Sequence, residues 1–175
     1  MQWSRVLLAL LSLSPASCAP QWHQPVGFVE PVQAPTYVCI DLVDERAIKA
    51  AAEATQAWDR SLVTWRHLVP IVEHDPTMCA IVIKEVVHPG PAASDALAWT
   101  STLGGRTITL VRGRHEHDTR GIVLHELGHA LGAQHVEGTL MAPRWRKGML
   151  CPDVTTVAQV AAWNHVNLDT LSWCY

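Results

Sequence analysis

The sequence predicts an α+β domain, and two patterns along the chain lead to this fold class. In three segments apolar residues recur three and four positions apart, as they do on the buried face of a helix. Between these segments lie short apolar and β-branched runs bounded by turn-forming residues, which are typical of strands. With 175 residues, of which 49% are hydrophobic and 17% charged, the chain is long enough for one domain with a buried core.

The first predicted elements are a strand and a long helix. The segment from Tyr37 to Val43 is apolar and rich in residues that favour strands. Asp44 can cap the helix that follows, which runs to about Leu62, because an aspartate there accepts hydrogen bonds from first-turn N–H groups. Trp58 belongs to the apolar face of this helix and is expected in the core. The predicted face consists of Ile48, Ala51, Thr55, Trp58 and Leu62.

Four further strands are predicted after this helix. The last two of them are separated by Gly104-Gly105, which favours a hairpin connection. Such segments of five to nine residues are too short for stable helices but lie within the usual length of strands. The predicted strands are Thr64 to Val69, Cys79 to Val87, Ala96 to Thr100 and Thr107 to Val111.

A loop and two helices complete the expected order of elements. His115 and His117 are expected on a solvated loop, and Asp118 or Thr119 then begins the helix that carries most of the motif described below. Asp153 can cap the last helix in the same way. One side of that helix is predicted to carry Val157, Val160, Ala161, Asn164 and Leu168.

The segment from Leu124 to Met141, LHELGHALGAQHVEGTLM, has the spacing of a metal site. His125 and His129 lie one helical turn apart, so both imidazoles can reach a single ion. Gly132 can adopt the left-handed conformation that ends a helix, and the chain can then turn to bring His135 back as a third ligand. Three histidines leave a tetrahedral zinc ion one open position for water, as in catalytic sites.

Glu126 is the expected general base of this site. It directly follows the first ligand, so its longer side chain can reach a zinc-bound water rather than the metal. Zinc lowers the pKa of such a water to about 7 in well-characterised enzymes. The implied reaction is hydrolysis of a peptide bond by Glu-assisted attack of the zinc-bound water, after which Glu126 carries the proton to the leaving amine.

The same residues give the chain a family resemblance. The pattern HExxHxxGxxH runs from His125 to His135, and Met141 in the sequence GTLMAP is similar to the methionine turn that follows this pattern in metzincins. The sequence Leu-Met-Ala-Pro is most similar to the matrixin branch of these zinc metallopeptidases. The resemblance implies a zinc endopeptidase that acts on proteins or peptides, with Met141 as an apolar floor beneath the metal.

The resemblance also implies a zincin-like fold and a metal content. The fold would contain a mixed, twisted five-stranded sheet with an N-terminal helix and the active-site helix, then a small C-terminal subdomain with the methionine turn and one helix. The strand from Ala96 to Thr100 would be the edge strand above the cleft. One catalytic zinc ion is implied. A second zinc or a calcium ion is not expected, because His88, Asp95 and His115 lack the spacing of the structural zinc site of matrixins.

The N-terminal residues predict export. Arg5 followed by the apolar run from Val6 to Leu13 has the form of a signal peptide, which we assign to residues 1–17. Residues 18–36 are rich in proline and are expected to form a tether, and residues 37–175 form the catalytic domain. Ala16-Ser17-Cys18 resembles a bacterial lipobox, so Cys18 is a candidate lipid anchor. The alternatives are a bacterial cell-envelope lipoprotein and a simply secreted protein.

The five cysteines bear on this choice, because an odd number in an exported protein leaves one unpaired. A lipid on Cys18 would use the odd cysteine. Cys39, Cys79, Cys151 and Cys174 could then pair in any of three ways. Cys151 and Cys174 flank the last helix, so a bond between them would staple that helix and leave Cys39 and Cys79 to tie neighbouring strands.

Composition and motif also limit the other functions. A net charge of −3 gives no electrostatic footprint for nucleic acid, and the only basic group is the short one around Arg144. The protein is expected to be a monomer that touches a membrane only through a lipid anchor. A catalytically inactive surface lipoprotein of metzincin fold is an alternative, although the presence of Glu126 argues against it. A structural zinc domain would need a fourth ligand, which the pattern lacks.

Overall fold

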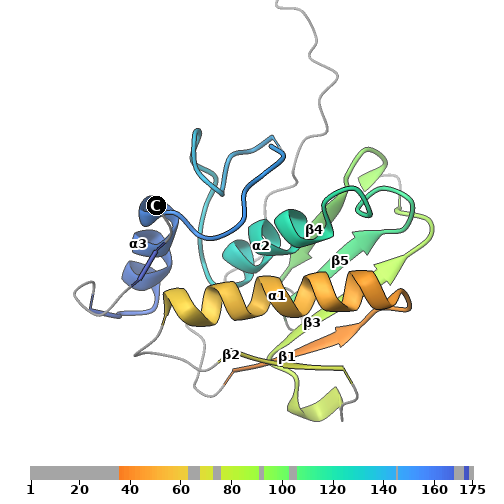
Figure 1. Cartoon of the computed structure of the whole chain (residues 1–175), viewed down its shortest axis with the longest axis horizontal. Coiled ribbons are helices and arrows are strands. Elements are labelled where there is room, and N and C mark those ends of the chain that lie inside the picture. Colours follow the sequence, from red (N-terminus) through yellow and green to blue (C-terminus); the bar gives the residue numbers. More distant parts are fainter. Residues whose placement is uncertain are drawn as a thin grey trace, which may run out of the picture.

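The structure, a computed structural model, describes residues 36–62, 68–72, 76–90, 93–102, 106–144, 146–167 and 172–173. A mixed five-stranded sheet lies behind two long helices, and a third helix lies beside them (Figure 1). This arrangement confirms the α+β class. The predicted signal peptide, Cys18 and the tether up to residue 35 lie outside the described residues, as do Gly104, Gly105, Leu168 and Cys174.

The strand order in the sheet is β2-β1-β3-β5-β4. Neighbouring strands are parallel except at β4, which pairs antiparallel with β5 and occupies the edge of the sheet. The tether was predicted to reach residue 36, but Thr36 is buried and already pairs with Leu68. The strands are β1 (Thr36–Asp41), β2 (Leu68–Ile71), β3 (Ile81–Val86), β4 (Ala98–Ser101) and β5 (Arg106–Val111).

The three α-helices of the described residues begin where an aspartate was expected to cap them. They are α1 (Glu45–Ser61), α2 (Thr119–Ala130) and α3 (Val154–Trp163). The side chains of Asp44, Asp118 and Asp153 each accept a hydrogen bond from a backbone N–H three residues later. These bonds satisfy first-turn donors that have no partner inside the helix.

Helix α2 lies in the interior, because α1 packs along it and strands β4 and β5 lie against it (Figure 1). All of its residues except Arg120 are buried. Trp58 of α1 is fully buried, as predicted, and its indole Nε1 donates a hydrogen bond of 2.9 Å to the carbonyl oxygen of Leu124. The packing therefore fixes the position of the helix that carries the histidine motif.

A disulfide joins Cys39 of β1 to Cys79, which lies just before the adjacent strand β3, and confirms the predicted link between neighbouring strands. Cys151 also takes part in a disulfide, and its partner is outside the described part of the chain. The predicted pairing of Cys151 with Cys174 therefore stays a prediction. Among the helices of the described residues, none is both long and apolar enough to cross a membrane.

Candidate metal and catalytic site

The chain turns sharply at Gly132, as the sequence predicts. Its φ of +103° lies in the left-handed region, which glycine adopts without steric cost. A Cβ at this position would also lie 2.4 Å from the ring of Trp163 on α3. The N–H of Ala133 closes the turn with a hydrogen bond of 2.8 Å to the carbonyl oxygen of Gly128. Both the backbone conformation and the close packing thus require glycine here.

This turn brings His135 back to the two histidines of α2. One ring nitrogen from each of His125, His129 and His135 lies within 4.8 Å of the others. The Nε2 atoms of His129 and His135 are 3.0 Å apart. The structure therefore assembles the three residues that the sequence predicted as metal ligands.

Backbone carbonyl groups orient two of the three rings. The carbonyl oxygen of Leu140 lies 2.8 Å from Nδ1 of His125, and that of Ala133 lies 2.9 Å from Nδ1 of His129. A carbonyl oxygen can only accept, so each Nδ1 carries the hydrogen and each Nε2 keeps its lone pair. This arrangement is common among metal-binding histidines, since the second ring nitrogen fixes the tautomer and the ring orientation.

Burial keeps the three imidazoles neutral. It is the main cause of a pKa well below the ordinary value for His125 and of a pKa of about 4 for His129, and the neighbouring histidines add to the effect. The pKa of His135, which is less buried, is also lowered by burial. Neutral imidazole is the form that binds a metal ion, so the site is ready for one at neutral pH without losing protons.

The histidine geometry fits a zinc ion. Nitrogen ligands lie about 2.0 Å from zinc, so two ligands of a tetrahedral ion are about 3.4 Å apart, close to the 3.0 Å between the Nε2 atoms of His129 and His135. His129 presents a lone pair in this contact, because its hydrogen is on Nδ1. A cation between the rings would bind this lone pair, together with one from His135 in the tautomer that carries its hydrogen on Nδ1.

Glu126 is fully buried and points toward the edge strand β4. Its Oε2 atom lies 2.6 Å from the hydroxyl oxygen of Thr100, and its Oε1 atom has no hydrogen-bond partner among the described residues. Burial raises the pKa of Glu126 to about 8, although the hydrogen bond from Thr100 acts in the opposite direction. A nearby cation would favour the ionised carboxylate and lower this pKa again.

The methionine turn lies directly below α2. Met141 is fully buried, and its sulfur comes so close to Gly128 that a Cβ on this glycine would lie 2.4 Å from it. The N–H of Leu140 donates a hydrogen bond of 2.7 Å to Asp153, whose other carboxylate oxygen caps α3. The turn is therefore held between the motif helix and the last helix.

Sequence reasoning missed some of these contacts. It assigned no role to Thr100, and it treated Asp153 only as a helix cap. Partial burial raises the pKa of Asp153, but hydrogen bonds from Leu140 and Thr156 outweigh it and hold the pKa below its ordinary value. Both contacts join residues far apart in the chain, so no local pattern could have revealed them.

A small, partly open hollow adjoins His125. Gly121 and His125 of α2 form one wall, and residues after the methionine turn form the other. Arg144 and Arg146 line its border and are exposed, as expected for this short basic group. The hollow thus opens at the surface beside one of the candidate metal ligands.

No protein-family model and no curated protein matches this chain. The motif and the geometry of the three histidines therefore support the candidate site. Among the described residues, one other group of metal-ligating side chains lies close together, and it involves Glu85, His115 and Glu116.

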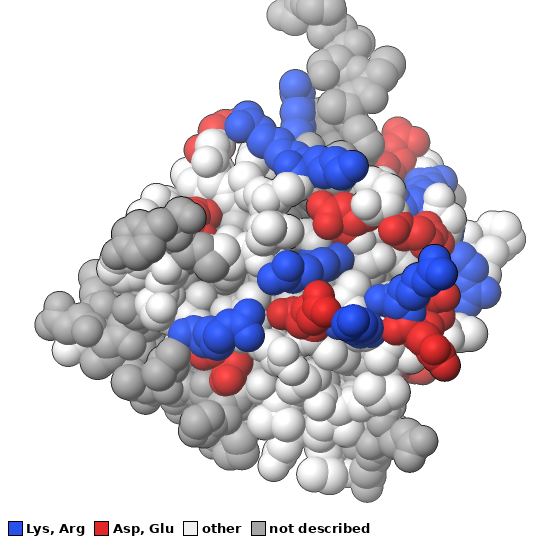
Figure 2. Space-filling view, in the orientation of Figure 1, with Lys and Arg blue, Asp and Glu red and all other residues white. Residues whose placement is uncertain are grey.

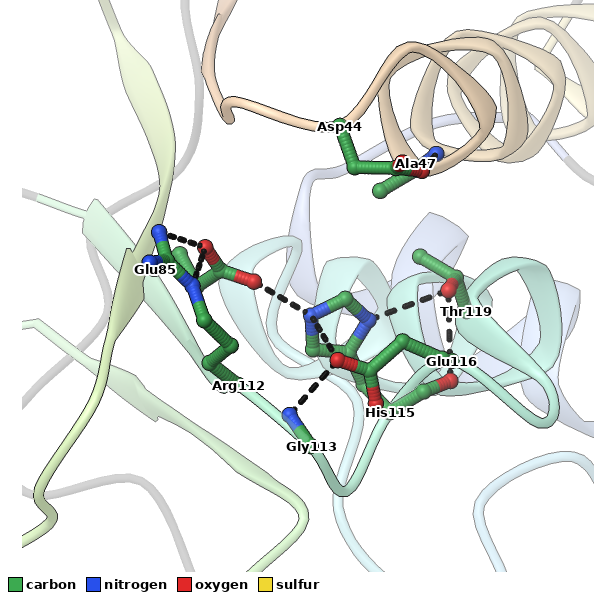
Figure 3. Close-up of polar contacts among 8 residues, drawn as sticks. All are labelled: Asp44, Ala47, Glu85, Arg112, Gly113, His115, Glu116 and Thr119. Carbon is green, nitrogen blue, oxygen red and sulfur yellow. Dashed lines mark hydrogen bonds and ion pairs between the residues drawn. The ribbon is translucent and has the colours of Figure 1, made fainter.

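The expectation that His115 lies on a solvated loop was wrong. Only 1% of its side chain is exposed. Its two ring nitrogens form hydrogen bonds with the side chains of Glu85 and Thr119 (Figure 3). His117 is exposed, as expected. His88 and Asp95, which the sequence offered with His115 as scattered metal ligands, do not join it in a group of ligand atoms.

Proposed function

We propose that the protein is a zinc-dependent endopeptidase of the metzincin type. The observation that carries this proposal is the convergence of three neutral, mostly buried imidazoles, two of them on the same helix as the fully buried carboxyl group of Glu126. The HExxHxxGxxH pattern and the methionine beneath α2 support the same family. The five-stranded mixed sheet with an antiparallel edge strand is compatible with it.

His125, His129 and His135 would hold the zinc ion through their Nε2 atoms. When bound, zinc supplies a Lewis acid that polarises the carbonyl group of the scissile peptide bond and acidifies a water molecule. Carbonyl groups of Leu140 and Ala133 keep two of the rings in the required tautomer. The protein thus contributes fixed ligands that need no rearrangement when the ion binds.

Glu126 would move the proton in the reaction. Its unpartnered Oε1 can accept a proton from the attacking water and then donate it to the amine that leaves. The ligand group contains only the three histidines among the described residues, which supports a catalytic role over a structural zinc site with four protein ligands. A buried carboxyl group without a compensating role would only cost stability.

We also propose that the protein is exported and that Cys18 carries a lipid. The basis is the N-terminal signal sequence and the lipobox-like Ala16-Ser17-Cys18. Replacing Cys18 with serine should release the protein from bacterial membranes into the soluble fraction. Membrane association that is unchanged in this variant contradicts the anchor.

The function is tested with zinc-loaded mature protein and unfolded casein, with and without a chelator. The variant Glu126→Gln removes the base but keeps the size and hydrogen-bonding capacity of the side chain. We expect chelator-sensitive cleavage that falls by about 10³-fold in the variant, while one zinc ion per chain remains bound. Glu116→Gln, the same exchange at an exposed glutamate, should cleave normally.

Two outcomes oppose the proposal. One zinc ion per chain with no cleavage of any protein substrate favours the inactive binding protein. Absence of zinc binding, measured by metal analysis after dialysis, contradicts both the zinc peptidase and the inactive zinc-binding protein.

A further inference from the structure

We propose that Thr100 is a positioning residue, which holds the carboxyl group of Glu126 so that Oε2 is engaged and Oε1 is left to transfer the proton. Thr100 lies on β4 and is 1% exposed. Its hydroxyl oxygen is 2.6 Å from Oε2 and 3.0 Å from the backbone carbonyl oxygen of Glu126. This inference rests on the proposed peptidase function and adds to it a residue that touches the base instead of the substrate.

Two contacts to one residue make the position of the carboxyl group specific. Bonded only to Oε2, the hydroxyl would leave the helix free to shift relative to β4. When the carboxyl group is protonated, the hydroxyl can accept from Oε2 and donate to the carbonyl oxygen of Glu126, so side chain and backbone share one anchor. With a carboxylate, its single hydrogen serves one of the two oxygens at a time. An error of about 1 Å in the placement of a catalytic group can lower a rate by about 100-fold, so such an anchor has a measurable function.

The hydroxyl group also suits both states of the base during turnover. It can donate its hydrogen to a carboxylate oxygen, or donate it to the carbonyl oxygen and accept from a protonated carboxyl. Thr100 therefore remains hydrogen-bonded before and after Glu126 takes a proton. Valine has nearly the same shape and offers neither hydrogen bond.

The neighbouring strand provides a matched control for this exchange. Thr109 on β5 is also buried, but it pairs with Trp99, the residue next to Thr100 in the strand. Neighbouring residues of a strand point to opposite faces, so Thr109 faces away from Glu126. Thr109→Val thus replaces a buried threonine in the same sheet without touching the base.

Kinetics with a fluorogenic peptide test the positioning role. We expect Thr100→Val to lower kcat by about 10- to 100-fold, with KM and zinc content unchanged. Thr100→Ser, which keeps the hydroxyl, should stay within about threefold of the wild type, as should Thr109→Val. Equal losses in the valine and serine variants, or full activity of Thr100→Val, would overturn the proposal.

Crystal structures of the zinc-loaded wild type and variants give a second readout that needs no turnover. We expect the Glu126 carboxyl group to move in Thr100→Val and to keep its position in Thr100→Ser. A carboxyl group that stays in place in Thr100→Val overturns the positioning role. A wild type that fails to cleave while its carboxyl group responds as expected refutes the peptidase function and leaves the positioning role intact.

A second inference comes from the hollow beside His125. The described residues that line it include Arg144 and Arg146 but no acidic side chain. The ion pair of Arg146 with Glu137 is weak, since the closest atoms are 3.8 Å apart and both side chains are largely exposed. In Figure 2 some Lys and Arg side chains lie at the top of the molecule, where Figure 1 places the loop after α2, and others are spread across the middle of this face among Asp and Glu.

The geometry points to a subsite for a substrate carboxylate adjacent to the scissile bond. Guanidinium groups match carboxylates in shape as well as in charge, and two of them stand at one border of a hollow that reaches a metal ligand. The carboxylate can belong to an acidic side chain or to the C-terminus of a short substrate. This inference also rests on the peptidase function.

A peptide library identifies the cleaved bonds, and amidated peptides separate the two sources of the carboxylate. We expect Asp or Glu to be enriched at one position flanking the bond, or cleavage near the C-terminus that amidation abolishes. Exchange of Arg144 and Arg146 for glutamine should reduce either preference by about tenfold, whereas Lys147→Gln, outside the hollow, should not.

Binding to zinc-loaded Glu126→Gln gives the same comparison without turnover. Peptides that contain aspartate should bind more tightly than their asparagine counterparts, or free-acid peptides more tightly than amidated ones. The absence of either preference, or a preference that persists without the two arginines, overturns the subsite. Preferential binding combined with a wild type that cleaves nothing refutes the peptidase function alone.

Discussion

Two groups of histidine and carboxylate side chains lie in the described part of this protein, and their surroundings differ. In the first, ring nitrogens of His125, His129 and His135 converge, and carbonyl groups fix the tautomer of His125 and His129. In the second, Glu85, His115 and Glu116 lie at the loop before α2, where Arg112 binds Glu85 at 2.7 Å (Figure 3). The first group consists of three histidines, whereas in the second the guanidinium group of Arg112 already pairs with a carboxylate.

This difference separates a candidate metal site from a structural network. Glu85 uses one oxygen for Arg112 and the other for His115, and Glu116 accepts a hydrogen bond from the N–H of Gly113. Burial alone would raise the pKa of Glu85, but its hydrogen bonds with Arg112 and His115 outweigh burial and lower it. The polar groups of the second group thus have protein partners. We interpret this hydrogen-bond network as the link that holds the loop before α2 against β3 and α2.

The largest expected effect separates the two groups by their metal content. His129→Ala removes a ligand whose ring is held in place, so we expect loss of bound zinc and of all peptidase activity. His115→Ala, which removes an equally buried histidine, should retain one zinc ion per chain. Metal analysis of the dialysed variants measures both. Zinc lost from His115→Ala and kept by His129→Ala would reverse the assignment.

The next effect concerns stability at the second group. His115 makes hydrogen bonds through both ring nitrogens, so His115→Ala leaves Glu85 without one of its partners. We expect the free energy of unfolding to fall by about 2 kcal/mol, as measured by urea denaturation of the metal-free protein. A change below about 0.5 kcal/mol contradicts a structural role for this network.

The pH dependence of the metal-free protein should report the first group. The raised pKa of Glu126, about 8 against 4.5, means that the folded state binds a proton which the unfolded state releases, so stability falls as pH rises toward 8. The lowered pKa of His129, about 4 against 6.5, has the opposite effect, so stability falls as pH drops below 6.5. From pH 6.5 to 8 the glutamate effect lowers stability, while the last deprotonation of histidines in the unfolded state opposes it in part, because burial also lowers the pKa of His125 and His135.

We therefore expect the ionisation of Glu126 to cost the metal-free protein about 1.5 kcal/mol of stability between pH 6.5 and 8, taken as the difference between wild type and Glu126→Gln, since each pKa unit corresponds to about 1.4 kcal/mol. Thermal unfolding after chelation measures the loss, and Glu126→Gln should remove it. A wild type that loses no stability relative to Glu126→Gln over this range shows that the carboxyl group is already ionised.

The smallest effect is expected at Arg112. Nearly half of its side chain is exposed, at 48%, so water screens its ion pair with Glu85. Arg112→Gln should destabilise the protein less than His115→Ala does, and the difference from wild type should shrink in high salt. A loss that equals that of His115→Ala at any salt concentration places the main contribution in the arginine.

Local patterns predicted much of the fold. Asp44, Asp118 and Asp153 cap the three α-helices as expected, because capping depends only on residues within one turn. Residues 64–67 of the predicted strand from Thr64 to Val69 lie outside the described residues, and the described strand β2 continues beyond Val69 to Ile71. Strand limits depend on the partner strand, here β1, and a single segment cannot specify that partner.

The sequence by itself determined the residues of the candidate metal site, because the spacing of His125, His129, Gly132 and His135 fixes their relation through helix geometry and one turn. Only the tertiary structure decided how they are held. It placed Thr100 against Glu126 and Asp153 against the methionine turn, and it buried His115 with Glu85. Such contacts form where separate elements pack together, and their spacing along the chain leaves no periodic signal to read.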